Sequence, residues 1–157
     1  MLSATLIERR DVAKSLQKKV PAVQRRVEDT LARLAIKLTA HVKADKLSGQ
    51  VLRNRTGRLR RSVNYRIDGR NTPQTQAAVG TNVVYARPHE YGGPVTVKEH
   101  LRMMTQAWGR PVKDPHPVTV KSHTVNYPLR SFLRSALKDM EDEIISGLRN
   151  SIKEEFK

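Results

Sequence analysis

The sequence contains no cysteine, and only 4% of its 157 residues are aromatic. The lack of cysteine excludes a disulfide framework, a thiolate nucleophile and cysteine-ligated zinc or iron–sulfur sites, and it fits a reducing cytosol. The scarcity of rings argues against the base-stacking surfaces of single-strand nucleic-acid binders. The N-terminus lacks the apolar run of a signal peptide, and no stretch approaches the about 20 apolar residues of a membrane span. We therefore expect a soluble protein without membrane contact.

Acidic residues are few relative to basic ones. Thirty Lys and Arg stand against fifteen Asp and Glu, which gives a formal net charge of +15. Such a charge opposes compaction and favours polyanions or acidic protein surfaces as partners. The length suits one ordinary domain with one core, so we predict a single domain over residues 1–157.

Apolar residues recur at steps of three and four in two segments, which is the pattern of an amphipathic helix. Residues 21–47 predict a long helix with Pro21 in its first turn. A shorter helix is expected over 11–19, and residues 2–8 are expected to form a strand or a disordered arm. A C-terminal helix is predicted from about Ser131. The apolar positions are Val23, Val27, Leu31, Leu34, Leu38 and Val42 in the first helix, and Leu133, Leu137, Met140, Ile144, Leu148 and Ile152 in the last.

The middle of the chain carries strand signals. Residues 62–68 alternate between apolar and polar side chains and predict a strand, and a turn cluster then leads to a second candidate strand over 76–81, so we expect an antiparallel hairpin. A third strand is predicted over 118–127, whereas the Pro- and His-rich residues 94–117 are expected to form a long, flexible flap. The order of elements predicts an α+β fold, in which an antiparallel sheet of about three to five strands packs against a long N-terminal helix and a C-terminal helix.

The most basic stretch, RNRTGRLRRSVNYRIDGR over residues 53–70, carries seven arginines and one acid. These arginines can bind phosphates, form the solvated face of a strand, or contact carboxylates of a neighbouring subunit, for which the planar guanidinium is well suited. We favour the solvated face and place a subunit contact second. The candidate subunit or partner contacts are Arg53, Arg55, Arg58, Arg60 and Arg61, together with Trp108 and Arg110 of the flap.

Histidines and carboxylates do not form a recognisable catalytic or metal pattern. His89 is followed by Glu90, but this pair lacks the second histidine four residues on that a zincin helix uses. No nucleophile elbow, phosphate-binding glycine loop or dinucleotide fingerprint occurs. We expect no metal, no cofactor and no enzymatic activity. A metal-dependent hydrolase that uses His89 and Glu90 is the third-ranked alternative.

Three strings in order carry a family resemblance: TGRLRRSV (56–63), VGTNVVYARPHEYGG (79–93) and YPLRSFLRSAL (127–137). Together they resemble the tailed-phage head–tail joining family, also described as tail-completion or neck proteins. Ser131 and Ser135 stand where that family usually has proline, and Ser131 is a suitable N-cap. The matching positions are Thr56, Gly57, Leu59 and Ser62 in the first string; Val79, Gly80, Thr81, Tyr85, Ala86, His89, Glu90, Tyr91 and Gly92 in the second; and Pro128, Arg130, Phe132, Leu133, Arg134 and Ala136 in the third.

The resemblance implies a structural virion protein of a tailed bacteriophage. It would complete the tail or join head to tail as a subunit of a ring, for which six copies are expected, after assembly in the host cytoplasm. The implied partners are further copies of itself, the head connector, the tail terminator or tail tube proteins, and, transiently, phage DNA in the channel. The motif positions are expected to be structural. The alternative function is a small basic DNA-binding protein, a phage-encoded regulatory or nucleoid-type factor, whose duplex binding would fall steeply with salt.

Overall fold

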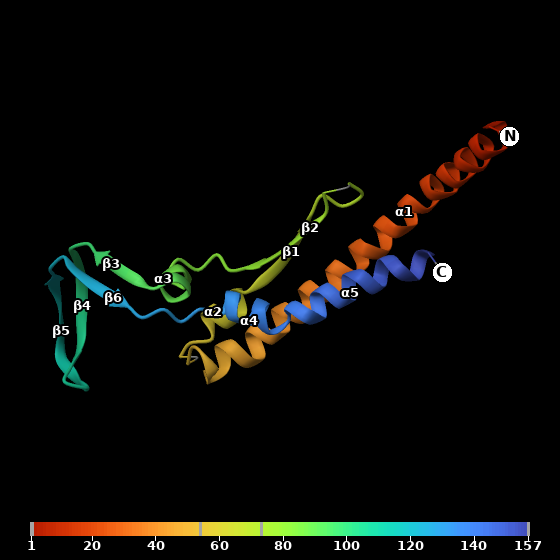
Figure 1. Cartoon of the computed structure of the whole chain (residues 1–157). Helices are drawn as coiled ribbons and strands as arrows, with labels where there is room; N and C mark the ends of the chain where they lie inside the picture. The colour runs from red at the N-terminus through yellow and green to blue at the C-terminus, as the bar shows by residue number, and fades with distance from the viewer. Residues whose placement is uncertain (1, 54, 73, 157) are drawn as a thin grey trace. The chain divides into compact units, whose positions relative to one another are not determined.

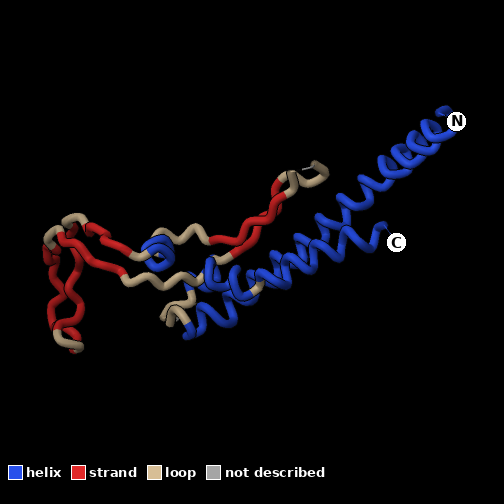
Figure 2. Tube along the Cα trace, in the orientation of Figure 1, coloured by secondary structure: helices blue, strands red, loops and turns tan. Residues whose placement is uncertain are grey.

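A computed structural model of the chain describes residues 2–53, 55–72 and 74–156, and within its first helix it describes no side chains for residues 2–13, 15 and 16. The contacts divide the chain into two compact units, which we treat separately. Unit 1 comprises Met1–Val83 and Ser131–Lys157, and unit 2 comprises Val84–Arg130. Figures 1 and 2 show the elements of both units. That they act as a single domain stays a prediction.

One long helix replaces the two that the sequence predicted. Helix α1 spans Leu2–His41 and contains Pro21, and the π-helical segment η1, Val42–Gln50, continues it. The prediction that Pro21 opens a separate helix was wrong, as was the strand or arm expected over residues 2–8. An internal proline removes one backbone hydrogen bond of the helix. Residues with high helix propensity on either side of Pro21 keep α1 continuous despite this missing bond. Gly49, at φ +135°, lies close to the end of η1, where a stop was predicted.

The predicted hairpin of unit 1 is confirmed. The short helix α2, Arg58–Ser62, leads into β1, Asn64–Asp68, which pairs antiparallel with β2, Gln76–Gly80. Both strands lie against α1.

The C-terminal helix is divided in two. Helix α4, Leu133–Asp139, is followed by α5, Glu141–Lys153, and by a final 3-10 turn, η2, Glu154–Phe156. The break falls at Met140, whose φ of −102° and ψ of 4° leave the helical region while its side chain stays buried. Ser131 does not act as the cap of α4, because Phe132 occupies the N-cap position without a side-chain cap bond.

The core of unit 1 lies where α2, η1 and α4 meet, since contacts join η1 to both helices. Val42, Val63 and Phe132 are its largest fully buried side chains. On the apolar face predicted for residues 62–68, Val63 is buried just before β1, whereas Tyr65 is 43% exposed. The apolar residues buried in unit 1 are Ala35, Val42, Leu47, Leu52, Val63, Phe132, Ala136 and Met140.

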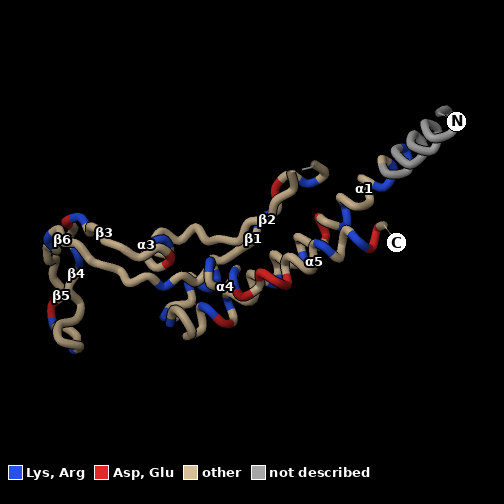
Figure 3. The backbone as a smooth tube through the Cα atoms, viewed as in Figure 1, with Lys and Arg blue, Asp and Glu red and all other residues tan. Residues whose placement is uncertain are grey.

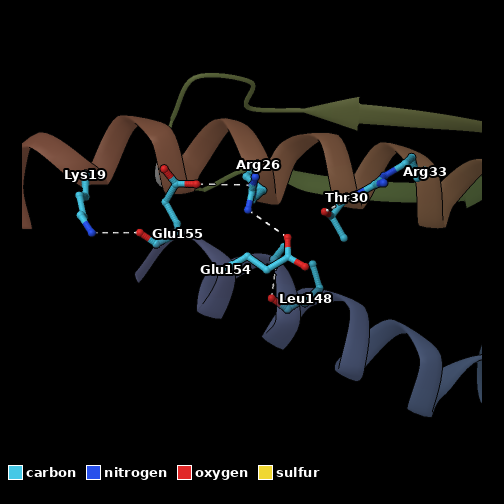
Figure 4. A network of polar contacts seen from close by, with 8 residues as sticks. Lys19, Arg26, Thr30, Arg33, Leu148, Glu154 and Glu155 are labelled. Atoms are coloured by element: carbon cyan, nitrogen blue, oxygen red, sulfur yellow. Dashed lines mark hydrogen bonds and ion pairs between the residues drawn. The ribbon is translucent and has the colours of Figure 1, made fainter. Parts of the chain in front are cut away.

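Polar contacts join α1 to the end of the chain (Figure 4). The Arg26 guanidinium lies 3.0 Å from a carboxylate oxygen of Glu154 and 3.5 Å from one of Glu155. Lys19 donates a hydrogen bond to the backbone oxygen of Glu155 at 3.2 Å, and its ammonium lies 5.6 Å from the centre of the Phe156 ring. These contacts accompany the packing of α5 and η2 along α1.

Unit 2 contains one short helix and four strands. Helix α3, Ala86–Tyr91, leads into β3, Gly93–Val97, which pairs with β6, His123–Tyr127. Between them lies a second ladder of β4, His100–Ala107, and β5, Arg110–Val120.

The flap over 94–117 is therefore strand, not loop, and the strand predicted over 118–127 is two strands with different partners. Three prolines in β5 suggested irregular backbone. They are tolerated because a two-stranded ladder leaves one edge of each strand unpaired, where a missing N–H breaks no bond.

The α+β class is confirmed, and its strands are distributed over three two-stranded antiparallel sheets. Among the residues described, no helix is both long and apolar enough to cross a membrane.

Candidate assembly surfaces

The arginine turn, defined here as residues 53 and 55–61, is a largely exposed and locally ordered surface of unit 1. Gly57 adopts φ +71° and opens α2, and its carbonyl accepts a hydrogen bond of 2.9 Å from the backbone N–H of Arg61. The Arg61 guanidinium also donates to the backbone oxygen of Thr56 at 3.2 Å. The first string of the family resemblance thus builds a turn that projects arginines outward.

The arginines predicted as partner contacts are exposed, and none of them forms an ion pair with a carboxylate in the described part of the chain. By contrast, Arg66 on the following strand pairs with Asp68 at 2.8 Å. Arg66 therefore fits the solvated strand face, whereas the arginine turn keeps its positive charge available to a partner. The five exposed residues are Arg53, Arg55, Arg58, Arg60 and Arg61.

A shallow depression of about 710 Å³ lies beside this turn. Arg58, Arg61 and Ser62 of α2 line it together with residues of β1, of β2 and of the segment just after β2. Ser62 and Thr81, whose hydroxyl oxygens are 2.6 Å apart, connect α2 to the segment after β2. This bond explains why a serine and a threonine stand at these two motif positions, since together they hold α2 against the sheet.

The second string holds unit 2 together. The His89 ring packs edge-on against Tyr127, with centroids 5.3 Å apart, and against Tyr85 at 6.5 Å. The backbone carbonyl of His89 accepts a hydrogen bond from the N–H of Arg130 at 2.9 Å. The segment 127–130 of the third string is thereby joined to α3.

His89 is a packing residue by its surroundings. Burial, and after it the positive charge of Arg130, lowers the pKa of His89 below its usual value, so the ring is neutral at pH 7. The Nδ1 atom of His89 is buried and forms no hydrogen bond with any described residue. Glu90 is also buried, at 4% exposure. Among the described residues, no three His, Asp or Glu side chains gather into a metal site.

The remaining motif positions serve turns and packing. Gly92 adopts φ +67° next to Leu129, and Phe132 is fully buried. Leu59, Gly80 and Leu133 are partly buried within unit 1, Tyr91 is largely exposed, and Pro128 and Arg130 lie exposed at the end of unit 2.

The β4–β5 ladder, residues 100–120, is the second exposed surface. None of its residues is buried, and Leu101 is 73% exposed. Trp108 is fully exposed at its tip, beside the exposed Arg110. The structure thus places both candidate residues of the flap in solvent.

Sequence reasoning missed an apolar groove of about 260 Å³ in unit 1. The predicted apolar face of α1 supplies Leu31, Leu34 and Leu38, and α4 supplies Leu133 and Leu137. The periodicity did identify these residues, but it indicated a closed core where the structure leaves an open hollow. Acidic residues at the start of α5, where the backbone tube in Figure 3 is red, follow directly after α4.

Comparison with known proteins identifies a family. The model of the phage virion morphogenesis family matches residues 32–153, which include the last part of α1, all of unit 2 and all of α5. No curated protein and no solved structure matches the chain significantly. The match covers well over half of the chain, and it includes all three strings of the resemblance. This chain therefore belongs to the phage virion morphogenesis family, whose members have a structural or assembly role in the virion.

Proposed function

We propose that this protein completes the tail or joins the head to the tail, as one subunit of a ring of identical copies, for which we expect six. Its neighbours would be the head connector and the tail terminator or tail tube proteins. A closed ring of one chain repeats a heterologous contact, so each subunit needs two different surfaces that fit each other.

The observation that carries this proposal is the exposed β4–β5 ladder. A two-stranded ladder without a covered apolar face is marginally stable in water. Here it displays Leu101, Met103 and Trp108 to solvent. Such a ladder gains stability when a partner covers it, which is what a subunit of an assembly provides. The arginine turn, whose arginines form no ion pair with a described carboxylate, supplies a second surface, one suited to carboxylates of another virion protein.

The proposal is tested by electron microscopy of lysates from phage in which this gene is stopped early, with and without the protein supplied from a plasmid. Filled heads lying apart from finished or overlong tails, restored to whole virions by the plasmid, are the expected result. Normal virions without the protein would exclude a joining or completing role. Duplex binding that falls steeply with salt, together with normal virions, would instead favour the DNA-binding alternative.

Reversing charge on the arginine turn should block joining. In the double variant Arg58→Glu, Arg60→Glu, two exposed cations become anions, so carboxylates of a partner would be repelled. We expect an unchanged circular dichroism spectrum and unjoined heads and tails in complementation.

The matched control reverses Lys18 and Arg25, two exposed cations of α1, and changes the net charge equally. Normal phage yield from the Arg58, Arg60 variant would count against the arginine turn as a contact.

A further inference from the structure

Trp108 stands in an unusual place for the only tryptophan of the chain. It lies between the last pair of the β4–β5 ladder, Ala107 and Arg110, and its side chain is fully exposed. An indole carries the largest apolar surface of any side chain, and tryptophan is enriched among the residues that dominate binding at interfaces. Full exposure leaves all of that surface available to a partner.

The backbone under Trp108 is also strained. Trp108 has φ +55° and Gly109 has φ +77°, so both central residues of this two-residue turn lie in the left-handed region. Hairpins with this turn favour Asn-Gly or Asp-Gly, because a bulky residue at positive φ is disfavoured. The turn thus holds an indole at the tip where asparagine would be more stable. A residue that weakens the hairpin and packs on nothing around it has its use outside unit 2.

The apolar groove of unit 1 has the size and lining for such a side chain. An apolar cavity of about 150 Å³ can hold one benzene ring. The groove measures about 260 Å³ and is lined mainly by aliphatic side chains. Leu137, on its wall, is 50% exposed, so the groove is open to solvent. Two fused rings fit a hollow of this size.

The groove has one basic lining residue, Arg134, and acidic residues follow it in the first turn of α5. Glu141 and Asp142 are exposed in the first turn of α5, just after the groove residue Leu137. On the hairpin, Arg110 follows Trp108 after a single glycine. In a chain with a net charge of +15, this acidic turn is one of the few places that a basic tip would be attracted to.

A second apolar hollow, of about 310 Å³, lies farther toward the start of α1 and is lined by Val20, Val27 and Phe156. Its carboxylate, Glu28, already accepts hydrogen bonds from the Asn71 N–H and the Thr75 hydroxyl. This hollow has no free acid for Arg110, so the groove beside Leu137 suits the hairpin tip better.

We propose that Trp108 of one subunit inserts into the groove of unit 1 on a second copy of this chain, with Arg110 against Glu141 and Asp142 of that copy. The inference deepens the proposed function, on which it rests, because it names the two surfaces of the repeated subunit contact. Each chain then offers one indole and one groove, so the contact is heterologous and can propagate around an axis. The inserted indole also covers the apolar face of α1 that lines the groove.

Engineered cysteines test the contact directly, since the chain has none of its own. Phage lysates complemented with the double variant Gln106→Cys, Leu137→Cys, which keeps Trp108 and uses an exposed position on the same hairpin, are treated with a short bismaleimide, and the products are separated under denaturing conditions. Covalent multimers of this chain, up to the full ring, are expected. The control pairs Val84→Cys with Leu137→Cys, because Val84 is 90% exposed and lies in unit 2 outside the hairpin.

Three outcomes would overturn the inference: no cross-link in assembled particles, a link within one chain, or a link from position 106 to another protein only. They are distinguishable from a failure of the proposed function. If stopping the gene separates heads from tails but the cysteines form no multimers, the joining function is supported and the Trp108 contact is excluded. If stopping the gene leaves normal virions, the proposed function itself falls.

The sole tryptophan gives a second measurement on the unmodified chain. Its fluorescence emission should shift to shorter wavelength as subunits associate at rising concentration or on tails, because the indole leaves water. Leu137→Arg, which places a charge in the groove, should abolish that shift. Trp108→Ala should weaken self-association by about 30-fold or more, and Trp108→Phe should restore part of it. Association of wild-type subunits without any emission shift would contradict insertion of Trp108.

Discussion

Gly92 shows how a single position holds unit 2 in shape. Its φ of +67° lies in the left-handed region, and a Cβ atom there would sit 3.0 Å from the backbone nitrogen of Leu129. The neighbouring Arg130 bonds to His89 from the same segment. The glycine therefore permits both the turn after α3 and the close approach of residues 127–130.

Gly92→Ala should loosen this junction. We expect a loss of about 1–3 kcal/mol from backbone strain, increased by the contact with Leu129. Hydrogen–deuterium exchange over residues 84–93 measures the effect as faster exchange. Gly93→Ala is the matched control, because Gly93 also has a positive φ, of +101°, but no atom within 4 Å of an added Cβ. Equal exchange in both variants would show that the close approach to Leu129 contributes nothing.

The His89 ring should make unit 2 sensitive to acid. Its pKa is lowered in the folded protein by burial and by Arg130, whereas the unfolded value is about 6.5. The unfolded chain therefore binds the proton more readily than the folded protein does. The contribution of His89 to stability is complete above about pH 6.5, and it is lost as the pH falls from there toward the lowered pKa of the folded protein.

NMR titration of the ring should give a pKa below 6.5. His89→Phe keeps a ring between the two tyrosines and should remove this part of the pH dependence of unfolding. An unshifted His89 titration would contradict the buried neutral ring.

At the scale of elements, the pairing of α1 with α5 and η2 combines an apolar stripe with exposed ion pairs. The Arg26 side chain is 42% exposed and its partner Glu154 is 61% exposed. Water and salt screen such pairs strongly, so apolar packing contributes most of the stability of this helix pair.

Arg26→Ala should therefore destabilise the protein by no more than about 1 kcal/mol, and the loss should shrink at high salt. Urea unfolding followed by circular dichroism at low and high salt measures it. Arg25→Ala serves as the control, because Arg25 is the exposed neighbour on α1 and forms no ion pair with a described residue. A loss of several kcal/mol for Arg26 would mean that the contact is better shielded from water than its exposure indicates.

Sequence periodicity predicts some of these elements and fails at others for physical reasons. The apolar face of α1 and the β1–β2 hairpin are predicted because one side of each is covered within unit 1. The β4–β5 ladder gives no such signal, because it has no covered face and its prolines resemble a loop. Met140 carries no sign of the break between α4 and α5, because a buried methionine fits an unbroken helix equally well.

Two of the candidate surfaces can be recognised in the sequence. The arginine turn is a cluster of charge and Trp108 is a lone aromatic residue, and both lie outside the segments with periodic apolar residues. The groove cannot be recognised in this way, because its residues have the spacing of an ordinary core. Only the structure shows that α4 and the sheet stop short of closing over α1.

At the scale of the whole molecule, removing the ladder should separate folding from assembly. Replacing residues 100–120 by two glycines would connect β3 to β6 as an ordinary hairpin, and the deleted segment contributes no buried residue. We expect helical circular dichroism and a thermal midpoint for unit 1 close to those of the full chain, with complete loss of joining in complementation. Whole virions assembled with the shortened chain would remove the ladder from the contact surface.

The placement of Phe132 has a consequence for synthesis on the ribosome. This core residue follows unit 2, whereas its partner region at Val42 precedes it, so about 90 residues are made between them. At roughly 5–20 residues per second, α1 waits about 5–18 s with its apolar side open, long enough for nascent-chain chaperones to bind it. Unit 2 is continuous in sequence and can fold during that interval. Unit 2 can therefore fold on the nascent chain before the N-terminal and C-terminal parts of unit 1 associate.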